Sequence, residues 1–342
     1  TGREEAVVRY YLDTFYWRLV RAGTVLEVAS RSTGYIVNWR RLKTGTPLVT
    51  MTVKRIPTGA GDFFAPNIRK LMQSILGRRT LENRISLKSR ELDYAILNKE
   101  RKVVARLERR NERAHMDRST DQILLPEYVY LVPYRGYEDE LEKLQRRVCG
   151  KARLVPVDSD PIEQVLERLG IDPEQYNNRP SFELRPDQPA LEVLRQIQAA
   201  FLRIMKQNVE GASRGDDPEF LHDFLVAERR TRCMLNQYPG VFPARGLAQI
   251  IQDLEWAESA ATPVRDLDIY LDLVDEFLGK VDSTHRRALK PLFRYLHDQK
   301  RNEQRRMRIA LESPRFKQVL RRWGDYLKAK PEGDLGSWDA AT

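Results

Sequence analysis

A histidine followed by arginines is the most chemically suggestive feature of the chain, in the segment EFLHDFLVAERRTR from Glu219 to Arg232. At 100° per residue, His222, Arg229 and Arg230 fall on one face of a helix, and Arg232 lies at its margin. The opposite face is apolar and consists of Phe220, Leu221, Phe224, Ala227, Thr231 and Leu235. No Ser or Cys nucleophile recurs on the polar face at helical spacing, and no orienting carboxylate does, so a catalytic triad is not indicated. An anion-binding face and an ordinary solvated basic face are the two readings that this helix leaves open.

A longer cationic stripe is predicted further along the chain. Its members advance by three and four residues and are Arg287, Lys290, Arg294, His297, Arg301, Arg305 and Arg308. The opposing apolar stripe consists of Leu289, Phe293, Leu296, Met307 and Ala310. A solvated helix usually mixes charge signs, whereas this stripe contains no acid, and like charges at that spacing cost roughly a few tenths of a kcal/mol per pair. A bound polyanion would relieve the repulsion, so the stripe favours a binding surface.

Charge is strongly segregated along the chain, which carries a net charge of +10. The segment from Arg286 to Lys330 holds 15 Lys and Arg against 4 Asp and Glu, a net +11, so the rest of the chain sums to −1. The segment from Leu247 to Asp282 holds 2 basic and 9 acidic residues, a net −7. Such segregation indicates a polyanionic partner that meets one surface.

Length and composition exclude several other classes of protein. With 342 residues and 41% hydrophobic content the chain can bury a sizeable core, and its length predicts two domains. Cys149 and Cys233 are far apart and have no Cys or His at ligand spacing, so neither a zinc site nor a disulfide framework is indicated, and a reducing cytoplasmic setting is expected. No apolar run is long enough to span a bilayer, and no P-loop occurs. We predict no cofactor, no metal and no membrane partner.

The hydrophobic pattern of the elements that position these residues changes along the chain, from the period of strands to the period of helices. As far as about Arg110, short β-rich runs separated by turns predict an antiparallel sheet or barrel. These runs are VVRYYLDTFYWRLV, TVLEVAS, GYIVNWRRL, RISLKSRELDYAIL and KVVARLERR, and EYVYLVPY follows them. YEDELEKLQRRV and PIEQVLERLG are then amphipathic helices, and NNRPSFELRPDQP is the best candidate linker. We therefore expect an α+β fold, with a β-rich domain at 1–150, a helix and linker at 151–186, a helical bundle at 187–332 and a tail at 333–342.

Local signals predict the ends of the bundle helices. Asp187 is a plausible N-cap for the first helix, and Gly211 is expected to end it. Thr262 and Pro263 have the pattern of an N-cap followed by a proline in the first turn, so we expect a helix to begin there. Pro291 is expected either to open or to kink its helix.

The helical half resembles the CHAD domain, the conserved histidine α-helical domain. The resemblance rests on a His-x-x-Arg-Val-x-x-Arg-Arg-x-Arg pattern, matched by His222, Val226, Arg229, Arg230 and Arg232. It also rests on the segment VRDLD and, after the basic helix, on ALESPRF. The resemblance implies a helical bundle that binds inorganic polyphosphate, with a location on polyphosphate granules as a family-level expectation.

Two departures from the family pattern stand out. The family's arginine three residues after the histidine is Leu225 here, which predicts one lost phosphate contact and an exposed apolar side chain. The family also repeats its four-helix unit, and only about the first half is matched in this sequence. A homodimer in which a second copy supplies the other wall of a basic channel is therefore a possible partner arrangement.

Four segments of the N-terminal half are YYLDTFYWRL, SRELDYAIL, KVVARLERR and VPYRGYEDELEKL. On these segments it resembles, more loosely, a degenerate CYTH domain, the triphosphate-tunnel fold. Enzymes of that family bind divalent metal through an N-terminal Glu-x-Glu-x-Lys strand, and REEAVVRY does not contain one. The alternation of Arg84, Lys88 and Arg90 on one strand face is compatible with a remnant anion-binding tunnel. Cations alone bind a triphosphate without activating water, so we expect no hydrolysis.

The function that we predict is polyphosphate binding by a basic helical surface, without catalysis. Arginine suits this ligand because it forms bidentate, charge-assisted bonds to phosphate oxygens. The predicted binding residues are His222, Arg229, Arg230, Arg232, Lys206, Arg287, Lys290, Arg294, Arg301, Arg305, Arg308 and Arg265. Arg265 has a competing interpretation, an intramolecular pair with Asp266 that fixes the start of a helix.

Three alternatives stay open. The main rival is a nucleic-acid or other polyanion binder, because the same cations neutralise any phosphate backbone. Nucleic acid is the less favoured partner, since no aromatic side chain interleaves the basic stripe to stack a base. The other two are a residual CYTH-type triphosphatase and a purely structural scaffold.

Overall fold

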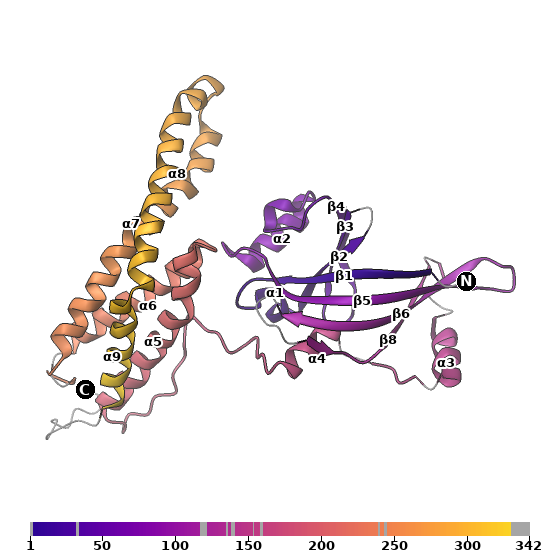
Figure 1. The fold of residues 1–342 in the computed structure, drawn as a ribbon, viewed down its shortest axis with the longest axis horizontal. Helices are drawn as coiled ribbons and strands as arrows, with labels where there is room; N and C mark the ends of the chain where they lie inside the picture. Colours follow the sequence, from indigo (N-terminus) through magenta and orange to yellow (C-terminus); the bar gives the residue numbers. More distant parts are fainter. Residues whose placement is uncertain are drawn as a thin grey trace. The chain divides into compact units, whose positions relative to one another are not determined.

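The computed structural model describes most of the chain. The described residues are 3–31, 34–116, 122–134, 136–137, 141–152, 154–157, 160–238, 240–242 and 245–329. They form two compact units, unit 1 (Thr1–Tyr176) and unit 2 (Asn177–Thr342). Unit 1 is built on a sheet and unit 2 is helical (Figure 1), so the α+β prediction is confirmed. None of the helices within the described ranges is both long and apolar enough to cross a membrane.

Unit 1 is built on one antiparallel sheet. Its strands are β1 (Arg3–Asp13), β2 (Thr24–Arg31), β3 (Gly34–Arg41), β4 (Pro47–Val53), β5 (Glu82–Leu97), β6 (Val103–Met116), β7 (Gln122–Leu124) and β8 (Tyr128–Pro133). The strand order is β4-β3-β2-β1-β5-β6, and β7 and β8 both pair with β6. Each predicted run contains a strand, and β4 and β7 are additional. The first run was predicted too long, because its strand ends at Asp13 and the residues from Arg18 onward are helical. Among the described residues β4 pairs only with β3, so the sheet is open rather than a closed barrel.

Helices cover both faces of the first strands. They are α1 (Arg18–Arg21), the 3-10 turn η1 (Ala60–Asp62), α2 (Pro66–Leu76) and α4 (Pro161–Arg168), whereas α3 (Leu141–Ala152) contacts β8. Met72 and Leu76 of α2 pack with Leu26, Val28 and Trp39 of β2 and β3 on one side of the sheet. Because the other side also carries a core, most of β2 is buried on both faces. Its sequence, TVLEVASR, is accordingly apolar at consecutive positions.

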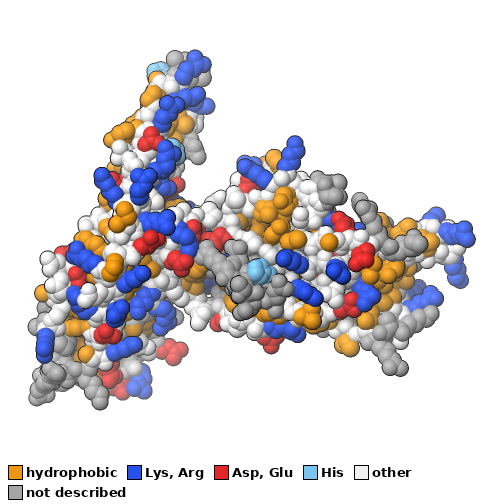
Figure 2. Space-filling model, in the orientation of Figure 1, with side chains coloured by type: hydrophobic (Ala, Val, Ile, Leu, Met, Phe, Trp, Pro, Cys, Tyr) orange, Lys and Arg blue, Asp and Glu red, His pale blue; other side chains and the backbone are white. Residues whose placement is uncertain are grey.

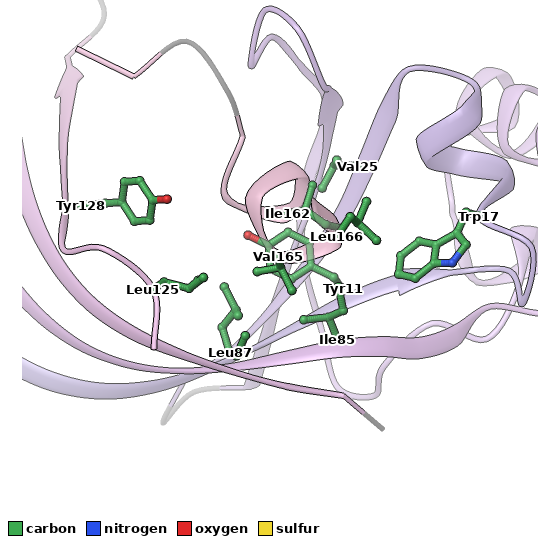
Figure 3. Packing of buried hydrophobic residues seen from close by; sticks show 11 residues of the cluster. Tyr11, Trp17, Val25, Ile85, Leu87, Leu125, Tyr128, Ile162, Val165 and Leu166 are labelled. Atoms are coloured by element: carbon green, nitrogen blue, oxygen red, sulfur yellow. The ribbon is translucent and has the colours of Figure 1, made fainter. Parts of the chain in front are cut away.

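The second core lies on the inner face of the sheet, defined here as the side that packs against α4. Ile162, Val165 and Leu166 of α4 contact Tyr11 of β1 and Leu87 of β5 (Figure 3). The sequence D-P-I-E explains why α4 begins where it does. The Asp160 carboxylate accepts a hydrogen bond from the Ile162 amide at 3.1 Å, Pro161 occupies the first turn, and the Asp160 amide donates to Glu163 at 3.1 Å. Although its sequence places α4 in a connecting segment, its apolar side belongs to the core of unit 1.

Unit 2 consists of five helices within the described ranges. They are α5 (Ala190–Arg214), α6 (Pro218–Gln237), α7 (Leu247–Lys280), α8 (Ser283–Glu312) and α9 (Pro314–Lys328). Helices α5 and α6 pack together, as do α7 and α8, while α9 contacts α5, α7 and α8. Asp217 caps α6 by accepting hydrogen bonds from the amides of Glu219 at 2.8 Å and Phe220 at 3.3 Å. The predicted helical bundle is therefore present.

Several predicted helix ends in unit 2 differ from the structure. Helix α7 runs through Pro263 instead of beginning there. Helix α8 continues through Pro291, so this proline does not open the helix, and a kink there stays a prediction. Ala261 is fully buried and Val264 is 1% exposed, so packing outweighs the local start signal. The Thr262 hydroxyl does not cap; it donates to the Glu258 carbonyl at 3.0 Å inside the helix.

The expected ends of α5 also differ. Pro189 rather than Asp187 stands at its N-terminus, and the helix passes Gly211 to end at Gly215, whose φ of 72° is left-handed. Gly211 has a packing role instead. A Cβ there would lie 2.5 Å from the Phe220 ring, so glycine allows α5 and α6 to approach closely.

Candidate functional site

Helix α6 presents the predicted two faces. All six residues of its apolar side are buried, and Arg229 and Arg230 are exposed. His222 is half-buried and lines a small hollow of about 140 Å³ together with Arg179 and Arg230. The Arg230 guanidinium carbon lies 5.9 Å from the centre of the Phe201 ring on α5. Because Asp223 also lines this hollow and accepts a hydrogen bond from Asn178 at 3.1 Å, the hollow is polar but not uniformly cationic.

Arg232 faces a different environment from His222. Its guanidinium forms ion pairs with Glu228 of its own helix and with Glu258 of α7, and Glu255 lies 3.8 Å away. Burial raises the pKa of Glu228 to about 7, although Arg232 opposes the shift. Glu228 is fully buried and its Oε2 has no hydrogen-bond partner. Arg232 is thus neutralised inside the protein and contributes least to an external cationic surface.

The prediction for Leu225 is wrong. We expected an exposed apolar side chain at the edge of the polar face, but Leu225 is only 7% exposed and belongs to the core. Its position on the helical wheel is close to that of buried Leu221, and the neighbouring helices cover it. An arginine at this position would be buried, so restoring the family residue would not add a phosphate contact here.

Helix α8 carries the predicted cationic stripe on its surface. All seven stripe residues are exposed, and Figure 2 shows Lys and Arg side chains along the length of the α7–α8 hairpin. Arg301 pairs with Asp298, and Arg308 pairs with Glu312 at 3.0 Å. Arg287, Lys290, Arg294 and Arg305 have no acid at ion-pair distance among the described residues. Since the helix is continuous through Pro291, these cations follow one line.

The middle of this stripe borders a hollow of about 570 Å³. His297, Arg301 and Arg305 line it from α8, opposite Arg214 and the loop that begins α6. The hollow also contains Asp268 of the VRDLD segment, which is 4% exposed and pairs with Lys300. No lining residue is shared with the hollow around His222. The predicted binding residues therefore fall into two groups rather than one.

Two further predicted residues lie apart from these groups. Lys206 is exposed on α5, and its ammonium group lies near Gly324 of α9. Arg265 is half-buried in the interior of α7, and its Nη1 is buried without a hydrogen-bond partner. The alternative interpretation of Arg265 is wrong, because no helix begins there and no pair with Asp266 is present in the described structure.

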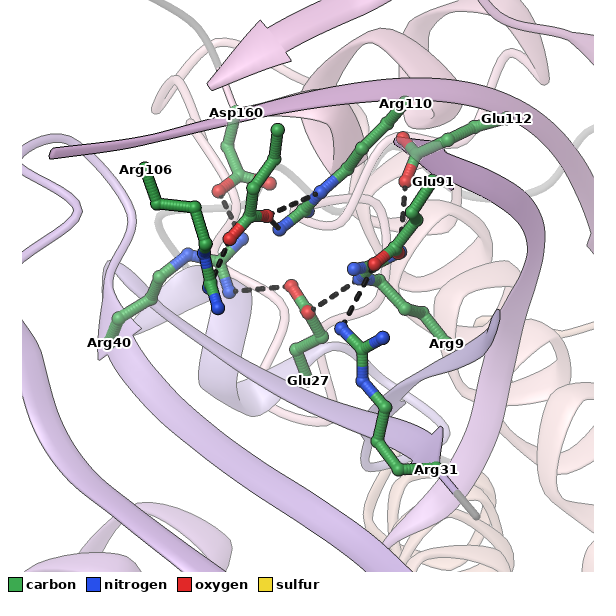
Figure 4. Close-up of polar contacts among 10 residues, drawn as sticks. Arg9, Glu27, Arg31, Arg40, Glu91, Arg106, Arg110, Glu112 and Asp160 are labelled. Atoms are coloured by element: carbon green, nitrogen blue, oxygen red, sulfur yellow. Dashed lines mark hydrogen bonds and ion pairs between the residues drawn. The ribbon is translucent and has the colours of Figure 1, made fainter. Parts of the chain in front are cut away.

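The inner face of unit 1 carries an unexpected network of buried charge (Figure 4). It contains the arginines Arg9, Arg31, Arg40, Arg106 and Arg110 and the acids Glu27, Glu91, Glu108, Glu112 and Asp160. Arg9, which is 1% exposed, pairs with Glu27 at 3.0 Å and with Glu91, and lies 3.4 Å from Glu112. Arg40 joins Glu27 at 3.1 Å to Asp160, the N-cap of α4. Positive and negative charges on this face therefore balance, because each arginine is paired with at least one carboxylate.

The pKa values of the acids in the network depend on how well each acid is paired with arginine. Burial alone would raise the pKa of Glu27, but the guanidinium groups of Arg40 and Arg9 outweigh it and lower the pKa to about 2. Burial dominates at Glu112 and raises its pKa. Glu112 Oε2 has no hydrogen-bond partner, which agrees with that direction.

Two of the three cations assigned to a remnant tunnel, Lys88 and Arg90, do not line the inner face. Lys88 and Arg90 point outward and are exposed, while Leu87, Ser89 and Glu91 are buried on the inner side. Arg84 sits at a register shift, where its guanidinium lies 4.9 Å from the Phe15 ring centre and 5.1 Å from the Trp17 ring centre. The inner arginines belong to other strand positions.

One acidic cluster on the inner face was missed in the sequence. Ligand oxygens of Glu91, Asp93 and Glu108 lie within 4.8 Å of one another, a spacing that could hold a metal ion. The signal was the Glu-x-Asp pair on β5, since residues two apart share a strand face, and Asp93 is in register with Glu108 on β6. Glu91 and Glu108 also pair with arginines, so a metal ion would compete with those guanidinium groups.

Comparison with known proteins bears mainly on unit 2. Residues 196–341 match the family model of the CHAD domain, which confirms the resemblance drawn from the histidine helix and the VRDLD segment. No curated protein sequence matches the chain. The antiparallel sheet of unit 1 is consistent with the CYTH-like fold that we expected.

Two solved structures show limited similarity. The CHAD domain from the plant Ricinus communis is 24% identical, with a TM-score of 0.37, over 43% of this chain and 48% of that chain. This chain thus spans about half the length of that relative. A protein from Bacillus halodurans described as a "putative adenylate cyclase" is 11% identical, with a TM-score of 0.35, over 47% of this chain and 82% of that chain.

Proposed function

We propose that the protein binds inorganic polyphosphate along the exposed cations of α8 and does not hydrolyse it. The observation that carries this proposal is the line of Arg287, Lys290, Arg294 and Arg305, which are exposed and have no described acid at ion-pair distance. A charge-assisted hydrogen bond contributes about 1.5–3 kcal/mol, so a few such contacts suffice for tight binding after ordering costs. The CHAD match over the same helices supports polyphosphate as the ligand.

Binding without hydrolysis is supported by the charge balance on the inner face. A phosphohydrolase of the tunnel type needs carboxylates that hold a divalent cation, whereas Glu27, Glu91 and Glu108 are each paired with arginine. Helix α4 fills part of the same face with apolar side chains. An assay of phosphate release from tripolyphosphate with magnesium tests this: we expect no release above buffer. Release that is abolished by Glu91→Gln would assign a metal-dependent activity to the inner face and contradict the proposal.

A charge-reversal series tests the binding surface. The helix variant Arg287→Glu, Lys290→Glu, Arg294→Glu should bind long-chain polyphosphate at least about a hundredfold more weakly, with a flatter salt dependence. Arg203, Lys317 and Arg321 provide a charge-matched control, because they are also exposed cations of unit 2 without a described acid partner. Equal weakening in the control would mean that net charge, and not the α8 line, determines binding.

Nucleic acid remains the rival ligand for α8. Titration with single-stranded DNA of matched charge, at two salt concentrations, separates the two. Polyphosphate should bind more tightly at both, because the seven stripe residues donate to phosphate and include no Phe, Tyr or Trp on which a base could stack. Equal competition by DNA would make the protein a general polyanion binder.

The homodimer stays a prediction. The outer half of α7 exposes Ile269, Tyr270, Leu273 and Phe277 at helical spacing, an apolar stripe that a second copy could cover. Acidic Asp266, which is exposed, flanks it on α7 and would complement the exposed cations of α8 in another copy. A solution mass measurement in 0.1–1 M salt tests this: a monomer at all protein concentrations contradicts the dimer.

A further inference from the structure

The outer face of β5 and β6 carries a second set of unmatched cations. Strand alternation directs Lys88 and Arg90 of β5 and Arg113 of β6 outward, and all three are exposed. Lys88 and Arg113 are directly opposite one another in the antiparallel register, and Arg90 is opposite Asn111. We call Lys88, Arg90 and Arg113 the outer-face cluster.

The outer-face cluster lies in a hollow of about 710 Å³. Small side chains of β1, Ala6 and Val8, form part of its floor, because they pair with Arg90 and Lys88 in the register. Two acids line the same hollow. Glu127 is occupied by Arg109 through two hydrogen bonds of 2.8 and 3.0 Å, and Glu4 lies opposite Leu92 on the neighbouring strand pair.

The charges of the cluster are not compensated within the described structure. No described acid lies at ion-pair distance from Lys88, Arg90 or Arg113. Like charges directly opposite on antiparallel strands destabilise a sheet, so the Lys88–Arg113 pair costs stability unless an anion lies between them. On the other side of the same two strands, every arginine of the buried network is paired with a carboxylate.

The spacing of the cluster fits a short chain of phosphates. Directly opposite side chains have Cβ atoms about 4.5–5.5 Å apart, and alternate residues of a strand are separated by about 6.6 Å. Three donors at these spacings can contact neighbouring phosphates of one chain, with the arginines forming bidentate bonds. None of the residues that line the hollow is aromatic, so the site offers no surface on which a base could stack.

We propose that the outer-face cluster is a second phosphate-chain site, which binds tripolyphosphate or a segment of a longer polyphosphate. The identity of the ligand rests on the function proposed for α8, whereas the site itself rests on the geometry of the sheet. A polyphosphate long enough to reach both sites would bind bivalently. The second contact is then intramolecular, so affinity for a long chain rises well above affinity for a short one.

The test uses the full chain and four proteins. They are the wild type, the outer variant Lys88→Glu, Arg90→Glu, Arg113→Glu, the helix variant described above, and their combination. Calorimetry with tripolyphosphate should show that the outer variant loses one class of site and that the helix variant retains it. Long-chain polyphosphate should bind the outer variant at least about tenfold more weakly, and the combination should show no binding.

A matched control keeps the charge change equal within unit 1. Lys43, Lys54 and Lys70 are exposed and have no described acid partner, so their replacement by glutamate changes the net charge of the same unit by the same amount. If the outer variant does not fold, the milder Lys88→Ala, Arg90→Ala, Arg113→Ala replaces it, because alanine removes the cations and the like-charge pair without adding acids.

The outcomes separate this proposal from the one for α8. If the outer variant and the control bind tripolyphosphate and long-chain polyphosphate equally well, the outer-face site is wrong and α8 is unaffected. If the helix variant binds like the wild type while the outer variant does not, the α8 proposal fails and the outer-face site stands. If single-stranded DNA of equal charge displaces tripolyphosphate from the outer-face cluster at the same concentration, the ligand class is wrong.

Discussion

The inner face of the sheet and the exposed side of α8 contain the same kinds of side chain in opposite arrangements. On the inner face, Arg9 and Arg40 are paired with Glu27, and the positive and negative charges of the cluster balance. Most of the cluster is buried, although Arg106 at its edge is exposed. On α8, Arg287 and Arg294 are exposed and no described acid compensates them. Burying a charge requires a partner, because the cost of desolvation is otherwise not recovered, whereas an exposed cation is hydrated at little cost. Only the second arrangement leaves charge available for an external anion.

The largest effect on stability is expected when an unpaired charge is placed in the core of unit 2. Leu225→Arg replaces a side chain that is 7% exposed. The substitution removes a buried leucine and adds a charge without a carboxylate partner, and we expect it to lower the free energy of unfolding by about 4 kcal/mol or more. Denaturant unfolding followed by the helical circular dichroism signal measures this. Near-wild-type stability with stronger polyphosphate binding would instead restore the interpretation of Leu225 as a surface position.

Removing one arginine from the buried network should lower the free energy of unfolding by nearly as much. Arg9→Ala leaves Glu27, Glu91 and Glu112 without their shared guanidinium, and removal of one partner from a buried pair costs about 3–5 kcal/mol. Urea unfolding of the full chain should show the loss in the transition of unit 1 only. A loss below about 1 kcal/mol would mean that water reaches the network and screens it.

Glu228 and Arg232 are an intermediate case, a mostly buried pair in which the acid is poorly compensated. The pKa of Glu228 is about 7 in the folded chain, above its ordinary value of 4.5, so its contribution to stability is fully present below pH 4.5 and lost as pH rises through 7. The wild type should lose at most about 3 kcal/mol over this range relative to Glu228→Gln. Chemical unfolding at several pH values measures the difference, and parallel pH profiles for the two proteins would exclude the titration of Glu228.

The smallest effect on stability is expected at the exposed cations. Arg294→Ala removes a side chain with no described acid partner and should change the free energy of unfolding by no more than about 0.5 kcal/mol, in either direction. Its affinity for polyphosphate should fall about tenfold. The two quantities are measured on one preparation, and a large loss of stability would show that Arg294 is part of the fold.

Where the sequence carries a strict period, it predicts the structure well. The strands of unit 1 and the two faces of α6 follow from alternation and from the helical repeat. Local cap signals at Thr262 and Pro263 failed because burial of Ala261 and Val264 stabilises a continuous α7. The prediction that Leu225 is exposed failed because its exposure depends on which helices pack against that edge of α6.

The candidate site was predictable only in part. Exposure of the α8 stripe follows from spacing alone, but the neutralisation of Arg232 depends on Glu258, which lies on another helix. On the sheet, an alternating charged pattern normally marks the solvent side. Here Glu91 and Glu112 occupy the buried positions, so the pattern pointed to the wrong face for Lys88 and Arg90. Pairing between distant strands decides such cases, and a single sequence does not contain it.

The placement of α4 has a consequence for how unit 1 is synthesised. Its residues Ile162, Val165 and Leu166 complete a core that begins with Tyr11, and the Tyr176 ring stacks on Tyr16 with centroids 3.2 Å apart. Contacts between such distant parts of a sequence slow folding. During synthesis the strands leave the ribosome before the helix that covers them. The inner face is therefore exposed to water until residues near 176 emerge. A fragment ending at residue 150 would keep every strand yet lack the element that closes the core.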